Sequence, residues 1–349
     1  MNTTWQIFLQ NQKAIFENGY VTYFNGGIRE FKDIQADTTI LADLSNMGLI
    51  RFSGEDAFNF LQGQFTCDLR KVTPQTAQHG SYCTPKGRIL ASFIIWQGAS
   101  VNEYILQLPV ILLAAVSKRL AMYILRAKVQ IQDDSDALIR IGVAGSKACT
   151  VVEELFQIDR SSLAPLAVIH TENASILCRE ADRYEIITPP DKAASIWSQI
   201  ASQAKPAGAA FWDWFEIRAG IPVILPDTQE QFIPQMVNLD AIGGVGFQKG
   251  CYPGQEIVAR TQYLGKLKRR MYRVNILSSE PVKPGDQLVC AELAEQACGM
   301  IVNAAPSPEG GYDGLAVIQT ANVDTDKICW KSLDGPLLRF QSLPYTVPE

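Results

Sequence analysis

The apolar positions in the first half of the chain change between strand-like and helix-like spacing, in an order that occurs twice. A strand at 49–52, a short helix, three further strands and a helix that begins at Pro109 make up the first set. The second set begins with a strand at 138–141 and ends with a helix that begins at Pro190. This repeated β-α-β-β-β-α order predicts two related α+β units.

The pattern changes after Ala204, where a Trp-rich helix at 211–218 leads into a long loop. Beyond Met271 the chain consists of short apolar runs separated by turn residues, which predicts a small C-terminal β-barrel. We therefore divide the chain into a first α+β unit, a second α+β unit, a short segment of unusual composition and a β-barrel, at residues 1–135, 136–245, 246–270 and 271–349.

The composition indicates an ordinary soluble globular protein. The 349 residues are 47% hydrophobic and 19% charged, which excludes a disordered chain, a collagen and a coiled coil. No apolar stretch approaches the roughly 20 residues of a membrane-spanning helix, and the N-terminus lacks the apolar core of a secretion signal. We expect a cytoplasmic protein with no membrane partner.

The eight cysteines are scattered. None forms a C-x-x-C pair, and neither histidine lies near a cysteine pair in sequence, so a conventional zinc site or iron–sulfur motif is not expected. Scattered cysteines in a cytoplasmic chain are mostly buried thiols that pack like small apolar residues. This is the expectation for seven of the eight.

Cys251 is the exception. Gly250 and Gly254 surround it with flexible backbone, and a short helix is predicted at 255–260. The positive end of the helix dipole and the nearby Lys249 both favour a thiolate, which would make this sulfur reactive. The alternative is a loop cysteine that only packs. The residues alone leave both open, because no neighbouring histidine supplies a general base.

Positive charge is concentrated around Cys251. The net charge is −5, but residues 249–273 contain seven cations and only one anion, Glu256, so this segment carries +6 and the rest −11. The cations are Lys249, Arg260, Lys266, Lys268, Arg269, Arg270 and Arg273. The segment predicts a face that binds phosphates or glutamyl carboxylates, and the alternative is an edge strand protected by Lys and Arg.

Residues 249–260 read KGCYPGQEIVAR, which resembles the K-G-C-Y-x-G-Q-E-x-x-A-R signature of the YgfZ family. These bacterial folate-binding proteins are related to the T protein (aminomethyltransferase) of the glycine cleavage system. Residues 61–68, 218–222, 232–239 and 268–270 are similar to further family segments and occur in the family's order. The resemblance extends from about residue 45 to residue 345.

The resemblance implies two ferredoxin-like α+β units and a C-terminal β-barrel around a central channel. It also implies a tetrahydrofolate-binding accessory protein in iron–sulfur cluster assembly or repair and in tRNA modification (thiolation), with Cys251 as the reactive residue. Its partners would be folate and iron–sulfur enzymes or assembly factors, including tRNA-modifying ones. Direct contact with tRNA stays open.

The site residues follow from the same resemblance. The catalytic candidates are Cys251 and Lys249, and the candidates for folate binding are Met47, Trp212, Gln62, Asp68 and Arg260. Trp212 matches a pocket tryptophan of the family, whereas Met47 falls where the family has an aromatic residue. Gln62 and Asp68 fit a turn or capping role equally well.

The sequence departs from the T protein where that protein carries its acids. Residues 87–92 contain no carboxylate at the position that orients the folate amine, and Arg218 replaces a glutamate. Without an acid to orient proton transfer, we expect a folate binder that lacks aminomethyl transfer. The alternatives are a folate-dependent one-carbon transferase and an RNA-binding module that uses the basic residues.

Overall fold

The computed structural model describes residues 1–35, 37–265, 267–290, 297–323 and 327–348. Contacts between residues divide the chain into two compact units, and the chain passes between them several times. The first unit consists of Met1–Phe58, Arg70–Gln78 and Ile94–Phe215, and the second of Asn59–Leu69, His79–Phe93 and Glu216–Glu349. Each unit therefore brings together segments that are far apart in the sequence.

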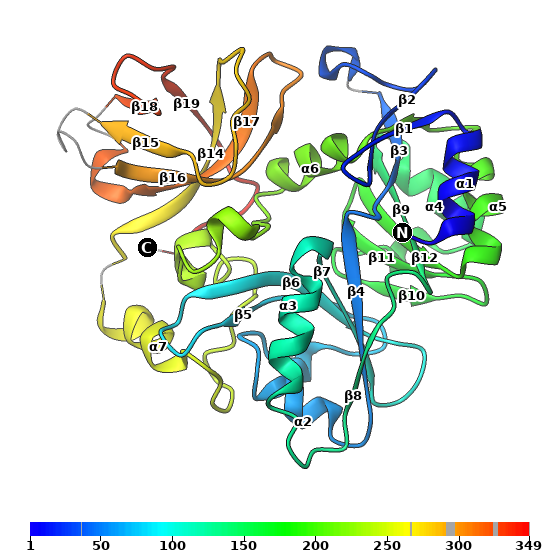
Figure 1. The fold of residues 1–349 in the computed structure, drawn as a ribbon, viewed down its shortest axis with the longest axis horizontal. Helices are drawn as coiled ribbons and strands as arrows, with labels where there is room; N and C mark the ends of the chain where they lie inside the picture. The colour runs from blue at the N-terminus through cyan, green and yellow to red at the C-terminus, as the bar shows by residue number, and fades with distance from the viewer. Residues whose placement is uncertain (36, 266, 291–296, 324–326, 349) are drawn as a thin grey trace. The chain divides into compact units, whose positions relative to one another are not determined.

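The first unit contains a six-stranded sheet in the order β10-β11-β12-β9-β3-β13 (Figure 1). Its neighbouring strands are antiparallel, except that β13 runs parallel to β3. The strands are β3 (Thr39–Asp43), β9 (Ile139–Gly145), β10 (Val168–His170), β11 (Ser175–Glu180), β12 (Arg183–Thr188) and β13 (Lys205–Ala207). The helices α1 (Thr3–Asn11), α4 (Ala148–Phe156), α5 (Pro190–Ile200) and α6 (Ala209–Arg218) and the hairpin β1 (Ala14–Glu17) and β2 (Tyr20–Phe24) accompany it.

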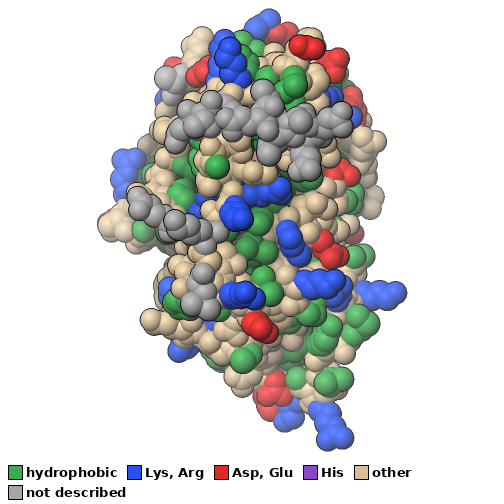
Figure 2. Space-filling model, turned by 90° about the vertical axis from the view of Figure 1, so that its left-hand side faces the viewer, with side chains coloured by type: hydrophobic (Ala, Val, Ile, Leu, Met, Phe, Trp, Pro, Cys, Tyr) green, Lys and Arg blue, Asp and Glu red, His purple; other side chains and the backbone are tan. Residues whose placement is uncertain are grey.

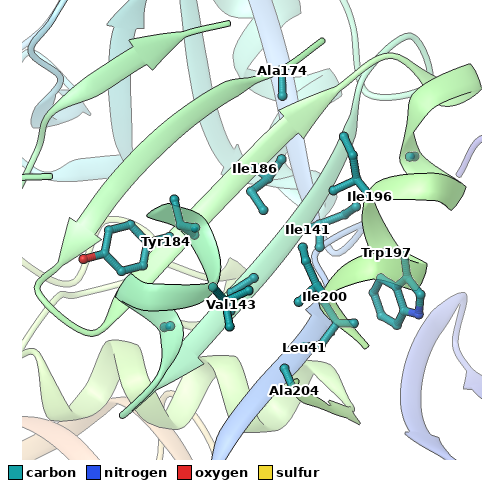
Figure 3. Close-up of a cluster of buried hydrophobic side chains, with 14 of the residues drawn as sticks. Leu41, Ile141, Val143, Ala174, Tyr184, Ile186, Ile196, Trp197, Ile200 and Ala204 are labelled. Carbon is teal, nitrogen blue, oxygen red and sulfur yellow. The ribbon is translucent and has the colours of Figure 1, made fainter. Parts of the chain in front are cut away.

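One face of this sheet packs against helices. Pro190 begins α5, where its missing N–H costs nothing. The buried residues of α5 recur at helical spacing and are Ala193, Ile196, Trp197 and Ile200. They meet alternate residues of the strands, including Ile141 and Val143 of β9 (Figure 3). Alternation along the strands and 3.6-residue spacing along the helix thus produce one core.

The opposite face packs against a second sheet, whose order is β5-β6-β7-β4-β8. Leu49 and Ile105 of this sheet share a hydrophobic cluster with Leu177 and Ile187 of the six-stranded sheet. The strands are β4 (Met47–Ser53), β5 (Gln78–Cys83), β6 (Ile89–Gln97), β7 (Glu103–Pro109) and β8 (Gln130–Asp133), and the helices are α2 (Ala57–Gln62) and α3 (Val110–Ala121). Strand β6 begins in the second unit and ends in the first.

The second unit contains an antiparallel sheet in the order β18-β15-β16-β17-β14-β19. A bridge between Cys329 and Leu337 joins the β18 edge to the residues before β19, so this sheet is curled. Its strands are β14 (Arg269–Ile276), β15 (Gln287–Cys290), β16 (Ala297–Pro306), β17 (Tyr312–Gln319), β18 (Ile328–Trp330) and β19 (Leu338–Gln341). Helix α7 (Gln255–Leu264) and the short 3-10 helix η5 (Pro234–Val237) belong to the same unit.

The structure confirms a mixed α+β fold and the order of elements in both predicted sets. Strand β12 (Arg183–Thr188) is the last of the three strands predicted between the two helices of the second set. Strand β3 lies within the predicted segment 1–135, but it pairs with β9, which lies within 136–245. The first predicted segment therefore contributes a strand to the sheet of the second, and the boundaries of the segments stay a prediction.

Candidate functional site

The predicted site residues fall in both units. Met47 and Trp212 belong to the first unit, and the other candidates, Gln62, Asp68, Lys249, Cys251 and Arg260, belong to the second. We describe each group within its own unit.

Residues 247–254, here called the cysteine loop, end where α7 begins. Gly254 has φ +84°, and a Cβ there would lie 2.5 Å from the Cα of Gly87 and from the carbonyl oxygen of Thr84. Only glycine fits such a conformation and approach without strain. The turn that contains Thr84 and Gly87 therefore fixes where α7 starts.

Cys251 is exposed, and the other seven cysteines are buried, as predicted. Burial raises the pKa of Cys67 and of Cys83 to about 12, so both stay protonated at neutral pH. A Cβ at the neighbouring Gly250 would meet no atom within 4 Å, so the loop is open beside the Cys251 thiol. Cys251 is thus the cysteine that a solute can reach, while its thiolate character stays a prediction.

Lys249 turns away from solvent and ties the cysteine loop to the chain segment that follows α2. Its Nζ donates to the carbonyl oxygens of Phe65 and Cys67, at 2.6 and 2.7 Å. The same Nζ lies 5.2 Å from the centre of the Tyr252 ring. These contacts give Lys249 a part in positioning the loop that carries Cys251.

Gln62 and Asp68 bond to each other beside this loop. The Gln62 side chain donates to Asp68 at 3.0 Å and accepts from the backbone N–H of Leu69 at 2.8 Å. A Cβ at Gly246 would lie 3.1 Å from the side chains of both Asp68 and Lys249. Gln62 and Asp68 therefore shape the turn next to the loop, and Arg260 lies exposed on α7.

Trp212 of α6 covers the face of the six-stranded sheet that is turned away from α5. It is 3% exposed, and it fills the space left by the missing side chain of Gly142, where a Cβ would lie 2.6 Å from the ring. The Arg183 guanidinium lies 5.5 Å from the centre of the ring, in cation–π range. The side chain of Leu44 also lies within 3.1 Å of that Cβ position, and Met47 follows in the same turn, where its N–H donates to the Leu44 carbonyl.

A buried polar cluster beside Trp212 was not predicted from the sequence. Glu185 pairs with Gly142 across β12 and β9, so its side chain leaves the sheet on the face that Trp212 covers. The Glu185 carboxylate accepts from Gln107 of β7 and lies 3.8 Å from Arg179 of β11. We call Gln107, Arg179 and Glu185 the polar cluster. Its members are 1%, 7% and 1% exposed.

A sequence signal for this cluster exists. Glu185 and Gln107 interrupt apolar strand segments, and buried polar side chains need partners. The sequence does not show that β7 and β12 face each other, so the hydrogen bond between Gln107 and Glu185 could not be predicted from it.

Two features are absent from the described residues. Among the described ranges, no group of three or more His, Cys, Asp or Glu side chains is placed to hold a metal ion. Within the same part of the chain, no helix is both long enough and apolar enough to span a membrane.

Comparisons with known proteins match most of the chain. The GCVT N-terminal domain matches residues 12–244. A protein of Colwellia psychrerythraea named tRNA-modifying protein YgfZ is 33% identical over 326 residues, which is 90% of this chain and 95% of that protein. Proteins of the same name from Klebsiella pneumoniae and Sodalis glossinidius are 30% and 29% identical over 313 residues, covering 88% of this chain and 94% of each relative.

A solved structure shares the fold. The crystal structure of glycine cleavage system aminomethyltransferase T from Bartonella henselae superimposes with a TM-score of 0.78 and covers 99% of this chain and 97% of its own. The two sequences are only 16% identical, so this likeness shows the fold alone.

Proposed function

This chain belongs to the YgfZ family, and from that premise we propose that it is a cytoplasmic, tetrahydrofolate-binding accessory protein of tRNA modification and of iron–sulfur cluster assembly or repair. The printed name of the relatives supports the role in tRNA modification. The observation that carries the proposal is the exposed Cys251 within the family signature, in a chain whose other seven cysteines are buried.

Finer features of the fold belong to the same proposal. The curled six-stranded sheet of the second unit would be the small β-barrel of the T-protein fold. The six-stranded sheet that contains β9 and the five-stranded sheet that contains β4 would be the cores of its ferredoxin-like units.

The residues around Trp212 suit the pterin ring of a folate. A pterin presents N–H donors along one edge, and Glu185 supplies a buried carboxylate acceptor beside an aromatic ring. Gln107 and Arg179 hold that carboxylate in place by donating to it or neutralising it. The donor set therefore fits, and Glu185 and Trp212 would hold the ring, with Met47 as a further apolar contact. When bound, tetrahydrofolate supplies a carrier of one-carbon groups.

In the second unit, the residues around Cys251 have different proposed roles. Lys249 anchors the cysteine loop through two backbone carbonyls, and Gln62 and Asp68 hold the adjoining turn. Cys251 then presents its sulfur to solvent, where it can carry sulfur, form a one-carbon adduct or ligate a cluster that is being transferred. Arg260, exposed on α7, would pair with a carboxylate of the folate glutamyl tail or of a protein partner.

A folate-dependent one-carbon transferase is the rival function, and the shared fold with aminomethyltransferase T favours it. The hydrogen bonds of Ser92 in the second unit argue against a transferase. Ser92, in the segment that lacks a carboxylate, donates to the Pro222 carbonyl and accepts from the Ile224 N–H, so its hydroxyl is already engaged. Turnover of methylene-tetrahydrofolate with an amine acceptor would establish the transferase.

The proposed role of Cys251 can be tested in a strain whose own copy of the gene is deleted. Wild-type protein should restore thiolated tRNA, and Cys251→Ala should not. Cys329→Ala is the matched control, because it removes a buried thiol from the same unit and should restore thiolation. Full restoration by Cys251→Ala would refute the role of this residue.

A further inference from the structure

The exposed surface around Cys251 is formed by two segments that are far apart in the sequence. Gly87, in the turn between β5 and β6, lies against the start of α7. A Cβ at this glycine would lie 3.1 Å from the Cβ of Ile257 and 3.3 Å from the Gly254 carbonyl oxygen. Lys86 comes directly before Gly87 and is exposed. The fold therefore places next to the cysteine loop a cation that the predicted basic segment did not include.

The structure shows which cations near the cysteine loop are already engaged. Lys249 donates to two backbone carbonyls, and Arg270 pairs with both carboxylate oxygens of Asp240, at 2.7 and 3.0 Å. Lys86 and Arg260 are exposed, and neither forms an ion pair among the residues that the structure describes. These last two cations are thus available to an anionic partner.

The surface around these two cations has an excess of positive charge. Figure 2 shows the face that carries α7, with more Lys and Arg than Asp and Glu side chains around its middle. Lys268 and Arg269, which follow α7, are also exposed, and Lys266 lies outside the described residues. Helix α7 itself contains one acidic residue, Glu256. A partner that approaches Cys251 therefore gains from negative charge.

An apolar side chain lies within this charged surface. Ile257 is 39% exposed and lies three residues before Arg260, so the two side chains are neighbours on the surface of α7. A protein partner can cover Ile257 with apolar side chains while its acidic residues pair with the cations around it. RNA phosphates would gain nothing from Ile257, and the net charge of −5 opposes a long polyanion.

We infer that the surface formed by Lys86, Ile257 and Arg260, here called the docking surface, binds an acidic patch of a protein partner and brings that partner to Cys251. The space beside the thiol is open, since a Cβ at Gly250 would meet no atom within 4 Å. The inference rests on the proposed role of Cys251 and names the class of partner that the thiol serves. Its tests use neither folate nor tRNA thiolation, so the docking surface and the proposed function can fail separately.

The charge around Cys251 can be measured on the purified full chain with two alkylating reagents that differ in charge. Iodoacetate is an anion and iodoacetamide is neutral, so the ratio of their rates cancels any change in the thiolate fraction. At low salt, Lys86→Ala should lower this ratio about twofold, and Arg260→Ala should change it in the same direction. Glu256→Gln should raise the ratio, and Lys283→Ala, an exposed cation elsewhere in the unit, should not change it. Equal ratios in all variants would overturn the docking surface.

The class of partner is tested with a short peptide of Glu-Glu-Leu repeats, which supplies acidic and apolar side chains. The peptide should protect Cys251 from iodoacetamide at low salt, and a peptide with Gln in place of Glu should not. Ile257→Thr keeps the two carbons that lie against Gly87 and should weaken the protection about fourfold.

Three outcomes of the peptide experiment would overturn the inference. Absence of protection by the acidic peptide would exclude an acidic partner at this surface. Unchanged protection in Ile257→Thr would exclude a protein partner and leave the glutamyl tail of a folate as the occupant. Stronger protection by a single-stranded RNA hexamer than by the peptide would replace the protein partner with RNA.

Discussion

The two units differ in how far their candidate functional groups are exposed to solvent. The first unit encloses Glu185, Gln107 and Arg179 between two sheets and shields them from water. The second unit presents Cys251 on a loop with open space beside it. A hydrogen-bond acceptor that is rigid and shielded from water binds the edge of a pterin ring more strongly, because hydrogen bonds are stronger away from water. A sulfur that must meet a partner needs access instead. Under the proposed function, this difference would place binding of the folate ring in the first unit and the chemistry of Cys251 in the second.

The largest effect expected from this contrast concerns the polar cluster. Glu185→Leu removes the carboxylate that faces the buried Arg179, and breaking such a pair costs about 3–5 kcal/mol. Glu256→Gln, at an exposed position of α7, should stay within about 0.5 kcal/mol of the wild type. Urea unfolding measures both. Equal stabilities would mean that the polar cluster is not a rigid feature of the first unit.

A smaller loss is expected where the cysteine loop meets α7. Gly254→Ala places a Cβ 2.5 Å from two backbone atoms at a φ of +84°, so we expect a loss of about 2–3 kcal/mol. Gly250→Ala is the matched control, since its Cβ would enter open space and should change stability little. Both free energies of unfolding come from denaturant titrations. A neutral Gly254→Ala would show that the turn at Gly87 does not fix the start of α7.

The buried thiols predict that the stability of the protein depends on pH. Burial raises the pKa of Cys67 and Cys83 from an ordinary value near 9 to about 12. Unfolded thiols lose their protons near pH 9 and the folded ones only near pH 12, so stability falls as the pH rises through this window. Cys83→Ala should make the fall less steep. Melting temperatures between pH 8 and pH 10 measure the difference.

The smallest effect on stability is expected at Cys251 itself. Cys251→Ala removes an exposed side chain and should leave the melting temperature unchanged. Alkylation of the native wild type should modify one thiol of eight, and denaturation should release the other seven. Mass spectrometry counts the labels. Rapid modification of a second native thiol would contradict the contrast between the buried cysteines and Cys251.

Local sequence patterns predicted most of the elements. Helix α5 begins at Pro190 and carries apolar residues at helical spacing, so its position was readable from the sequence. Strand β3 was missed, although all five of its residues are buried. A short strand buried on both faces has no alternation of polar and apolar residues, and its partners β9 and β13 lie far along the chain.

The exposure of a candidate residue was predictable where its signal is local, and contacts that depend on the tertiary structure were missed. The exposure of Cys251 follows from two flanking glycines and the start of a helix, which neighbouring residues encode. The bond from Gln107 to Glu185 joins strands of two sheets and needs the register of both. Lys249 was expected to act on Cys251, but its Nζ reaches backbone carbonyls that only the fold brings near.

The most direct test of the account is calorimetric titration of the full chain with tetrahydrofolate. The account predicts one binding site, an affinity at least about tenfold weaker for Trp212→Ala, and no change for Cys251→Ala. Trp214→Ala is the matched control, because two residues along a helix it faces another side. Absence of binding to the wild type, or loss of binding in Cys251→Ala with Trp212→Ala unaffected, would contradict the division of binding and chemistry between the two units.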